Sequence, residues 1–420
     1  MEKDKPDIKQ LMAVLARVPV KTEFPFAVEK HDIEVQFIGS DGSMCTRPLC
    51  VYLPGNAEKP APLVFNAHYE IAEGSGELGM YLEKGWALST PIEFKNEYNA
   101  VLTADDLAFN SAALSAVRKL PEIDRTRIAV IGGSAGGYMC LMLSALHLGI
   151  CCTVSFCGIT NMLFNMGYYF PGAHDHNLKA LAELTDEERA DPMRRMETMP
   201  VPILGSIYDF FAPIRDYFPD AGDYSRWATF SPVCLAKSFS NPVLFTHFTS
   251  DVLVPIDQLT KSFTPPEPGD TLPEGFKLRL SDYELPGELQ YSMAEALPAG
   301  EVAERLYLPP EEKVDNMIGY DISKRFNIAV YDEGRVEALA SHVKNFTYGR
   351  NNPTAYIGAQ FAATSRLTNI LTPQKLALLA ERYTGKSVQL PSLKGSHEVM
   401  DELIEYTKGR DIYSYHLKIV

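Results

Sequence analysis

One segment restricts the fold of this chain more narrowly than any other. Residues 127–140 read RIAVIGGSAGGYMC, with a short run of mostly β-branched residues before the glycines and a densely apolar stretch after them. The run at 128–131 is typical of a strand buried on both faces, and the stretch at 138–148 is typical of a buried helix that Gly149 can end. The sequence therefore predicts a strand, a glycine-rich turn and a helix, with Ser134 in the turn.

Two kinds of site use glycines at such a turn. In a dinucleotide-binding turn, G-x-G-x-x-G, Ser134 would occupy the second glycine position, and no acidic residue for a ribose follows about twenty residues later. Residues 132–136 (GGSAG) instead match G-x-S-x-G at every position. That pattern is the nucleophile elbow, in which a strained turn projects a serine hydroxyl above a sheet.

The rest of the chain alternates between strand and helix patterns. Short apolar runs predict strands at 31–37, 47–53, 62–66, 86–90, 152–157 and 242–246. Helix patterns lie between several of them, at 71–84 and 103–120. The first two strands read as an antiparallel pair, and the others as strand-helix-strand units. We therefore expect an α/β protein with a mostly parallel sheet flanked by helices.

Two stretches interrupt this alternation and define the expected organisation. Residues 159–231 suit a cap over the carboxyl edge of the sheet, and residues 259–371 contain proline-rich and acidic segments that predict a second large insert before the last strand. The core would then comprise 1–158, an acid-bearing part at 232–258 and a C-terminal part at 372–420. The sequence assigns no role to the second insert.

Composition argues against several classes of function. The 420 residues are 46% hydrophobic and carry a formal net charge of −15, whereas nucleic acids and anionic membranes require clustered Lys and Arg. The first twenty residues lack an apolar signal core, and no run of about 18 apolar residues occurs. The seven cysteines mostly lie in apolar runs. We expect a cytoplasmic protein with reduced thiols and no nucleic-acid or membrane partner; self-association is compatible with the sequence.

A serine nucleophile requires a carboxylate and a histidine, which follow it in the chain in that order in this type of site. Asp251 is the first carboxylate after the predicted strand at 242–246, and Asp257 is the alternative. Three histidines remain after Asp251. We favour His397, which follows a helix pattern, a strand pattern and a loop, over His342 in a helical pattern and over His416 near the end.

Other residues are expected to bind the oxyanion or the substrate. The backbone N–H of Ala135 and a donor from Tyr69, in the loop VFNAHYEIAEG, would bind the oxyanion. His68 and the apolar side chains of the expected cap would line the substrate pocket, with packing as the alternative role; these cap residues are Met162, Phe164, Tyr168 and Tyr169. The sequence HDH at 174–176 lacks a third ligand, so we expect neither a metal nor another cofactor.

At these residues the chain resembles the α/β-hydrolase superfamily, in particular its prolyl oligopeptidase-like and acetyl xylan esterase-like branch. LPEIDRTRIAVIGGSAGGYMCLMLSAL is similar to that branch's elbow segment, and NPVLFTHFTSDVLVPIDQ to its acid segment. The resemblance covers roughly residues 45–160, 227–260 and 372–410, and it implies Ser134 as nucleophile, Asp251 as acid and His397 as base.

The expected function is therefore that of a serine hydrolase that works through an acyl-enzyme. We expect a carboxylesterase-like activity on small or medium esters with apolar or aromatic groups. A prolyl oligopeptidase-like peptidase or amidase is the first alternative, in which cap carboxylates such as Asp175, Glu183, Asp186 and Glu187 would hold a substrate amine. A carbon–carbon hydrolase, or a binding protein without catalysis, are the remaining alternatives.

Overall fold

The computed structural model describes residues 23–92, 102, 104–147, 149–168, 175–199, 224–249, 251, 253–263, 279–307, 321–331 and 351–367. Its strands are β1 (Val28–Ile38), β2 (Met44–Pro54), β3 (Ala61–Asn66), β4 (Ala87–Pro91), β5 (Ile123–Gly133), β6 (Cys152–Phe156), β7 (Val243–Phe248), β8 (Val302–Tyr307) and β9 (Phe326–Tyr331). Within the described residues these strands form one sheet in the order β1-β2-β4-β3-β5-β6-β7-β9-β8.

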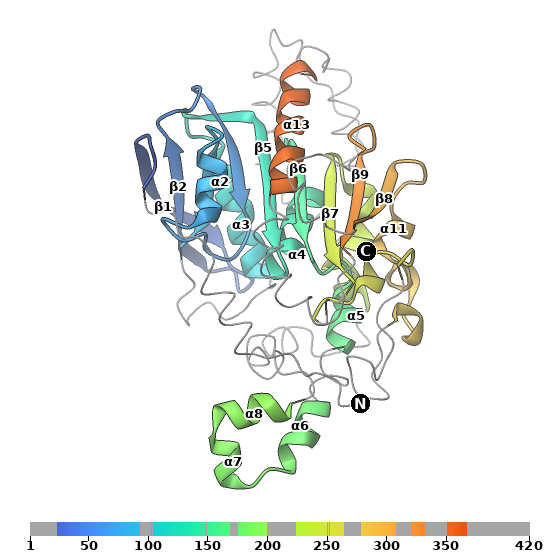
Figure 1. Cartoon of the computed structure of the whole chain (residues 1–420). Helices are drawn as coiled ribbons and strands as arrows, with labels where there is room; N and C mark the ends of the chain where they lie inside the picture. Colours follow the sequence, from blue (N-terminus) through green and yellow to red (C-terminus); the bar gives the residue numbers. More distant parts are fainter. Residues whose placement is uncertain are drawn as a thin grey trace.

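The sheet is antiparallel at one edge and parallel elsewhere (Figure 1). β1 pairs with β2, and β2 pairs with β4, in antiparallel fashion. All neighbouring strands in the remaining order β4-β3-β5-β6-β7-β9-β8 are parallel. The strands β3 and β7 are buried along their whole length, as their mostly apolar sequences predict. The expected α/β architecture is confirmed.

Helices cover both faces of the sheet. The longer ones are α3 (Ala104–Val117), α4 (Ala135–Leu146) and α13 (Asn351–Leu367), and the shorter ones before α13 are α2 (Gly76–Leu82), α5 (Met162–Gly167), α6 (Asp175–Ala182), α7 (Asp186–Ala190), α8 (Pro192–Thr198), α10 (Tyr224–Thr229) and α11 (Met293–Ala296). The 3-10 turns are η3 (Pro232–Ser238), η4 (Ile256–Gln258), η5 (Leu280–Asp282) and η6 (Gly287–Gln290). No helix of the described part is long and apolar enough to cross a bilayer.

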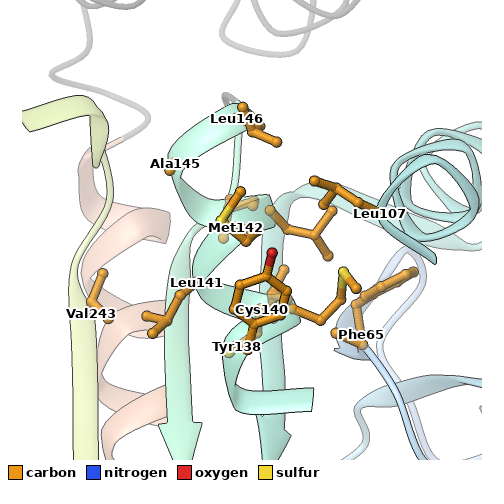
Figure 2. Packing of buried hydrophobic residues seen from close by; sticks show 14 of the residues in the cluster. Phe65, Leu107, Tyr138, Cys140, Leu141, Met142, Ala145, Leu146 and Val243 are labelled. Atoms are coloured by element: carbon orange, nitrogen blue, oxygen red, sulfur yellow. The ribbon is translucent and has the colours of Figure 1, made fainter. Parts of the chain in front are cut away.

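The two faces of the sheet have separate apolar cores. Residues of α3 and α4 pack into one core, and residues of α2 and α13 into the other. All twelve residues of α4 are buried, because the helix lies between the sheet, α3 and η3. Figure 2 shows its side chains directed both toward Leu107 and Phe65 and toward Val243. This packing fixes the helix that begins immediately after Ser134.

The segment expected as a cap is helical where it is described. α5 follows β6, and α6 to α8 lie on the side of the sheet to which the arrow of β7 points (Figure 1). Thr185 caps α7 through a capping box, in which its hydroxyl accepts the N–H of Glu188 at 3.2 Å. The boundaries 159–231 remain a prediction.

The segment 259–371 was expected to be an insert, but parts of it belong to the sheet or pack on it. β9 pairs in parallel with β7, β8 pairs with β9, and α13 packs against β5, β6 and α2. The strand-like sequence FNIAVY at 326–331 is thus an interior strand of the sheet, between β7 and β8. The sequence did not predict that β8 and β9 join the sheet, because turn residues dominate the segments on either side of these two short strands.

Candidate active site

Ser134 has the backbone conformation that the elbow requires. Its φ is 53° and its ψ is −114°, a region that costs a non-glycine residue about 1–3 kcal/mol. Two backbone hydrogen bonds hold it there: its N–H donates to Phe156 O at 2.7 Å, and its carbonyl accepts the N–H of Tyr138 at 3.0 Å. Ser134 is half-buried at the junction of β5 and α4, so its side chain is held at the carboxyl edge of the sheet.

The glycines around Ser134 are required by close backbone approaches. A Cβ on Gly132 would lie 2.1 Å from the carbonyl oxygen of Gly136, and a Cβ on Gly137 would lie 2.7 Å from the Cα of Gly158. Neither distance is compatible with a side chain. The turn therefore exists in this form only with glycine at these positions, which explains the pattern that the sequence displays.

Hydrogen bonds hold the loop after β3 beside the elbow. The side-chain amide of Asn66 donates to the carbonyl oxygens of His68 at 3.2 Å and Tyr69 at 2.5 Å, and Thr90 Oγ1 accepts the N–H of Ile71 at 2.9 Å. These contacts hold the loop backbone in place although it has no regular structure. Tyr69 is therefore presented at a fixed position next to Ser134.

The phenol of Tyr69 interacts with the side chain of Ser134. Burial raises the pKa of its phenol, and a hydrogen bond with the side chain of Ser134 lowers that pKa in part, so the phenol stays protonated at neutral pH. The residue as a whole is 46% exposed. A neutral phenol beside the serine is a suitable donor to an oxyanion.

His68 occupies a different environment. It is only 3% exposed, its Cβ lies 3.0 Å from where a Cβ of Gly136 would be, and its ring centroid is 4.4 Å from that of Tyr69. Burial, and to a smaller degree the charge of Arg47, lower its pKa to about 4. His68 is therefore a buried, neutral ring that packs against the elbow at Gly136, and its expected role in substrate binding remains a prediction.

Three residues that were expected to contact the substrate are buried in the protein interior. Met162, Phe164 and Tyr168 are fully buried, and the ring of Phe164 meets Tyr283 edge-on at 5.1 Å. Tyr169 and His174 are outside the described residues. As described, these three side chains stabilise α5, and a role for them in a pocket remains a prediction.

Asp251 follows β7 in a tight turn. Its Oδ1 accepts the backbone N–H groups of Leu253 and Val254, each at 2.9 Å, and its side chain is 8% exposed. Oδ2 lies 3.9 Å from Nε2 of His247. One oxygen thus anchors the turn while the other is available to orient a base.

The alternative carboxylate, Asp257, has a structural contact instead. It is 6% exposed in η4 and accepts the backbone N–H of Leu280, and burial raises its pKa. It holds the segment 279–282 against the core. The role of Asp251, rather than Asp257, as the acid remains a prediction.

Hydrogen bonds of buried side-chain amides support the turn that contains Asp251. Asn165 Nδ2 donates to Leu253 O at 3.3 Å, and Gln258 Nε2 donates to Asn165 Oδ1 at 2.6 Å. Gln258 Oε1 accepts the backbone N–H groups of Thr160 and Asn161 at 2.8 and 3.0 Å. No sequence pattern indicated this network, because its members lie in separate segments.

The predicted base lies outside the described residues, as do His342 and His416. Among the described histidines, His247 lies nearest to Asp251 in sequence, but it is 1% exposed and its Nε2 lies 2.6 Å from the carbonyl oxygen of Val254, to which it donates. A ring buried and held in this way cannot exchange protons with a substrate. Within the described part, Cys157, His247 and Asp251 form the one group that could hold a metal ion, and the sequence reading missed it.

No family model matches the sequence, and no curated protein matches it. Among solved structures, the chain is similar to an acylaminoacyl peptidase of Pyrococcus horikoshii, with 14% identity, a TM-score of 0.46 and coverage of 93% of this chain and 45% of the other. A puromycin-hydrolyzing peptidase of Mycobacterium tuberculosis gives 15% identity, a TM-score of 0.42 and coverage of 77% and 39%.

The chain thus spans less than half the length of these structures. Such distant likenesses carry no argument about activity. The fold is established by this chain's own features, namely an antiparallel edge, the parallel order β4-β3-β5-β6-β7-β9, helices on both faces, and a strained serine between β5 and α4. The chain has the α/β-hydrolase fold.

Proposed function

We propose that the protein is a serine hydrolase in which Ser134 forms an acyl-enzyme. The observation that carries this proposal is the conformation of Ser134, a non-glycine residue at φ 53° with glycines in close backbone contact around it. Backbone strain of this kind at a strand-to-helix turn is costly and is typical of a nucleophile that must project from a sheet.

The oxyanion would be bound by two donors. The N–H of Ala135 lies in the first turn of α4, where backbone donors have no partner within the helix and the helix dipole favours negative charge. The phenol of Tyr69, which contacts the Ser134 side chain, would supply the second hydrogen bond. Removing one such donor typically costs about 10²–10³ in kcat.

Asp251 would orient the base, and two histidines compete for that role. The sequence reading favours His397. The sheet order favours His342, because β9 lies directly beside β7, with Tyr331 paired to Phe248, and His342 follows Tyr331 by only eleven positions in the sequence. A chain leaving β9 starts at the same sheet edge as Asp251, which is where the sites of parallel sheets gather.

In the proposed reaction, the base removes the proton of the Ser134 hydroxyl as Oγ attacks the substrate carbonyl. The tetrahedral oxyanion is bound by Ala135 and Tyr69, and the base then returns the proton to the leaving group. Water, activated by the same base, hydrolyses the acyl-enzyme. Asp251 keeps its negative charge and stabilises the imidazolium.

The substrate is a carboxylic ester or an amide, since both are cleaved by this machinery. The ester remains the first prediction from the sequence. The amide is the alternative that the names of the similar peptidase structures describe, and those likenesses extend to the fold only.

Labelling with a fluorophosphonate probe tests the nucleophile. We expect one labelled peptide containing Ser134, no label in Ser134→Ala, and unchanged labelling in Ser115→Ala, whose hydroxyl bonds within α3. We expect Ser134→Ala to lower turnover by about 10⁴-fold or more. Labelling of another serine, or normal turnover of Ser134→Ala, would contradict the proposal.

A matched pair of variants tests the base. With Ser134 confirmed, His342→Ala and His397→Ala are compared on aryl esters and aminoacyl amides at saturating substrate. The variant that removes the base should lose about 10⁴-fold in kcat, and the other should stay near the wild-type rate. The same panel decides between ester and amide substrates.

A further inference from the structure

Three metal-binding side chains converge beside the proposed active site. The sulfur of Cys157, a ring nitrogen of His247 and a carboxylate oxygen of Asp251 all lie within 4.8 Å of one another. They come from two neighbouring strands: Cys157 directly follows β6, His247 lies on β7, and Asp251 follows β7. The cluster therefore lies at the carboxyl edge of the sheet. Its first strand, β6, is the neighbour of β5, which ends directly before Ser134.

The backbone holds these residues in position. Cys157 has a φ of 46°, which is uncommon for a residue with a side chain, and its N–H donates to Thr246 O at 2.8 Å, so it is tied to β7. Cys157 and His247 are 7% and 1% exposed. Buried cysteine and histidine side chains lose little conformational freedom when they bind an ion, because the fold has already fixed them.

Further contacts orient two of the three side chains. The Val254 carbonyl accepts a hydrogen bond from Nε2 of His247, while the N–H groups of Leu253 and Val254 hold Oδ1 of Asp251. Such outer contacts commonly orient metal ligands. Coordination through Nδ1 would retain the bond to Val254, whereas coordination through Nε2 would replace its proton by the metal.

A thiolate, an imidazole and a carboxylate form a ligand set for zinc, which accepts S, N and O ligands at about 2.0–2.3 Å in tetrahedral geometry. We propose that Cys157, His247 and Asp251 bind Zn²⁺, and that bound zinc inhibits hydrolysis because it occupies the carboxylate that would orient the catalytic base. The thiol releases one proton on binding, and water takes the fourth position. The side chains must approach one another by about 1 Å from their 4.8 Å limit.

Metal binding is independent of the proposed hydrolase function, whereas the inhibition rests on it. The test therefore has two readouts on the full chain. Cobalt(II) chloride titration reports binding through visible absorption bands and a thiolate-to-cobalt charge-transfer band. Zinc chloride titration of hydrolysis, with reversal by EDTA, reports inhibition.

Cys157→Ala and His247→Gln remove one ligand each and leave the proposed catalytic groups intact. Cys45→Ala, a half-buried cysteine on β2, is the matched control. We expect wild type and Cys45→Ala to give the cobalt spectrum and to be inhibited by zinc. Both ligand variants should lose the charge-transfer band or bind at least about 100-fold more weakly, and should resist inhibition.

The outcomes are distinguishable. A cobalt spectrum with sulfur ligation that requires Cys157, in a protein without hydrolase activity, would support the site and contradict the proposed function. Absence of cobalt binding in the wild type, or equal binding by wild type and Cys157→Ala, would overturn the site. Zinc inhibition of equal strength in all four proteins would overturn the proposed mode of inhibition.

Discussion

Ser134 and Asp251 are held in position by different means. Around Ser134, backbone meets backbone: Gly132 faces Gly136, and Gly137 faces Gly158, at distances that exclude any side chain. Around Asp251, buried side-chain amides from Asn165 and Gln258 support the turn. The first arrangement tolerates no added atom, whereas the second depends on complete hydrogen bonding.

This difference determines how each side fails. An added methyl group in the elbow must push two backbone segments apart, which disturbs the strand, the helix and Ser134 together. A missing amide near Asp251 leaves buried N–H groups unsatisfied, at about 1–3 kcal/mol each, and releases the turn without displacing the sheet. We therefore expect steric substitutions to act most strongly on the elbow and polar substitutions on the acid turn.

Gly132→Ala should give the largest loss of stability. Its Cβ would lie 2.1 Å from the Gly136 carbonyl oxygen, so we expect the free energy of unfolding to fall by more than about 4 kcal/mol, with loss of fluorophosphonate labelling. Gly42→Ala is the control: its φ is 82°, with nothing within 4 Å, so only the backbone strain of about 1 kcal/mol applies. Equal losses in chemical denaturation would contradict the close packing of the elbow.

Gln258→Met should act on the acid turn. It keeps the side-chain length but leaves the N–H groups of Thr160 and Asn161 without their acceptor, so we expect a loss of about 2–4 kcal/mol in unfolding free energy. Displacement of Asp251 should also lower kcat by about tenfold or more. Gln290→Met, at an exposed position, should change neither quantity, and a wild-type kcat in Gln258→Met would disconnect the network from catalysis.

The same contrast explains what the sequence reveals. The elbow was predicted from residues 127–140, because close backbone approach requires glycines at fixed spacing between a strand pattern and a helix pattern. The amide network joins Thr160 to Gln258, 98 positions apart, and polar residues at such distances carry no spacing signal. The cluster of Cys157 and His247 was missed for the same reason: it depends on the pairing of β6 with β7.

The strand-helix-strand units were predictable up to β7, whereas the full order of the sheet was not. Short connections indicate that β1 lies beside β2, β3 beside β4 and β5 beside β6, but they do not indicate that β3 lies between β4 and β5. β9 lies beside β7 although β8 precedes it in the chain, and the long sequence between them is dominated by turn residues. His397 was favoured over His342 because of the helix, strand and loop patterns before it, and that preference was formed without β9 beside β7; it stays a prediction.

A pH measurement examines the support beneath the elbow. Burial lowers the pKa of His68 to about 4, below its value of about 6.5 in an unfolded chain, so the unfolded state takes up the proton first. The stabilisation is complete above about pH 6.5 and is lost as the pH falls toward 4, by up to about 3 kcal/mol.

In His68→Phe, which keeps a ring against Tyr69, the loss of unfolding free energy between pH 7.5 and 4.5 should be smaller than in wild type by about 2 kcal/mol. Denaturant titrations at the two pH values measure this difference. An identical loss in both proteins would mean that His68 does not carry the effect.

The smallest expected effect has the opposite sign and comes from a glycine on the other face of the sheet. Gly358 lies within α13, and a Cβ there would meet the Trp86 ring at 3.5 and 3.6 Å, which is ordinary van der Waals contact. Alanine restricts the unfolded chain and favours the helix, so Gly358→Ala should raise the free energy of unfolding by about 0.5–1 kcal/mol. Thermal unfolding of Gly358→Ala and Gly132→Ala in one experiment measures the expected gain and the expected loss of stability. A loss of stability in Gly358→Ala would show that the contact between α13 and Trp86, which includes the Phe361 ring, is as intolerant of added atoms as the elbow. The contrast between a glycine required by packing and one that is not would then be removed.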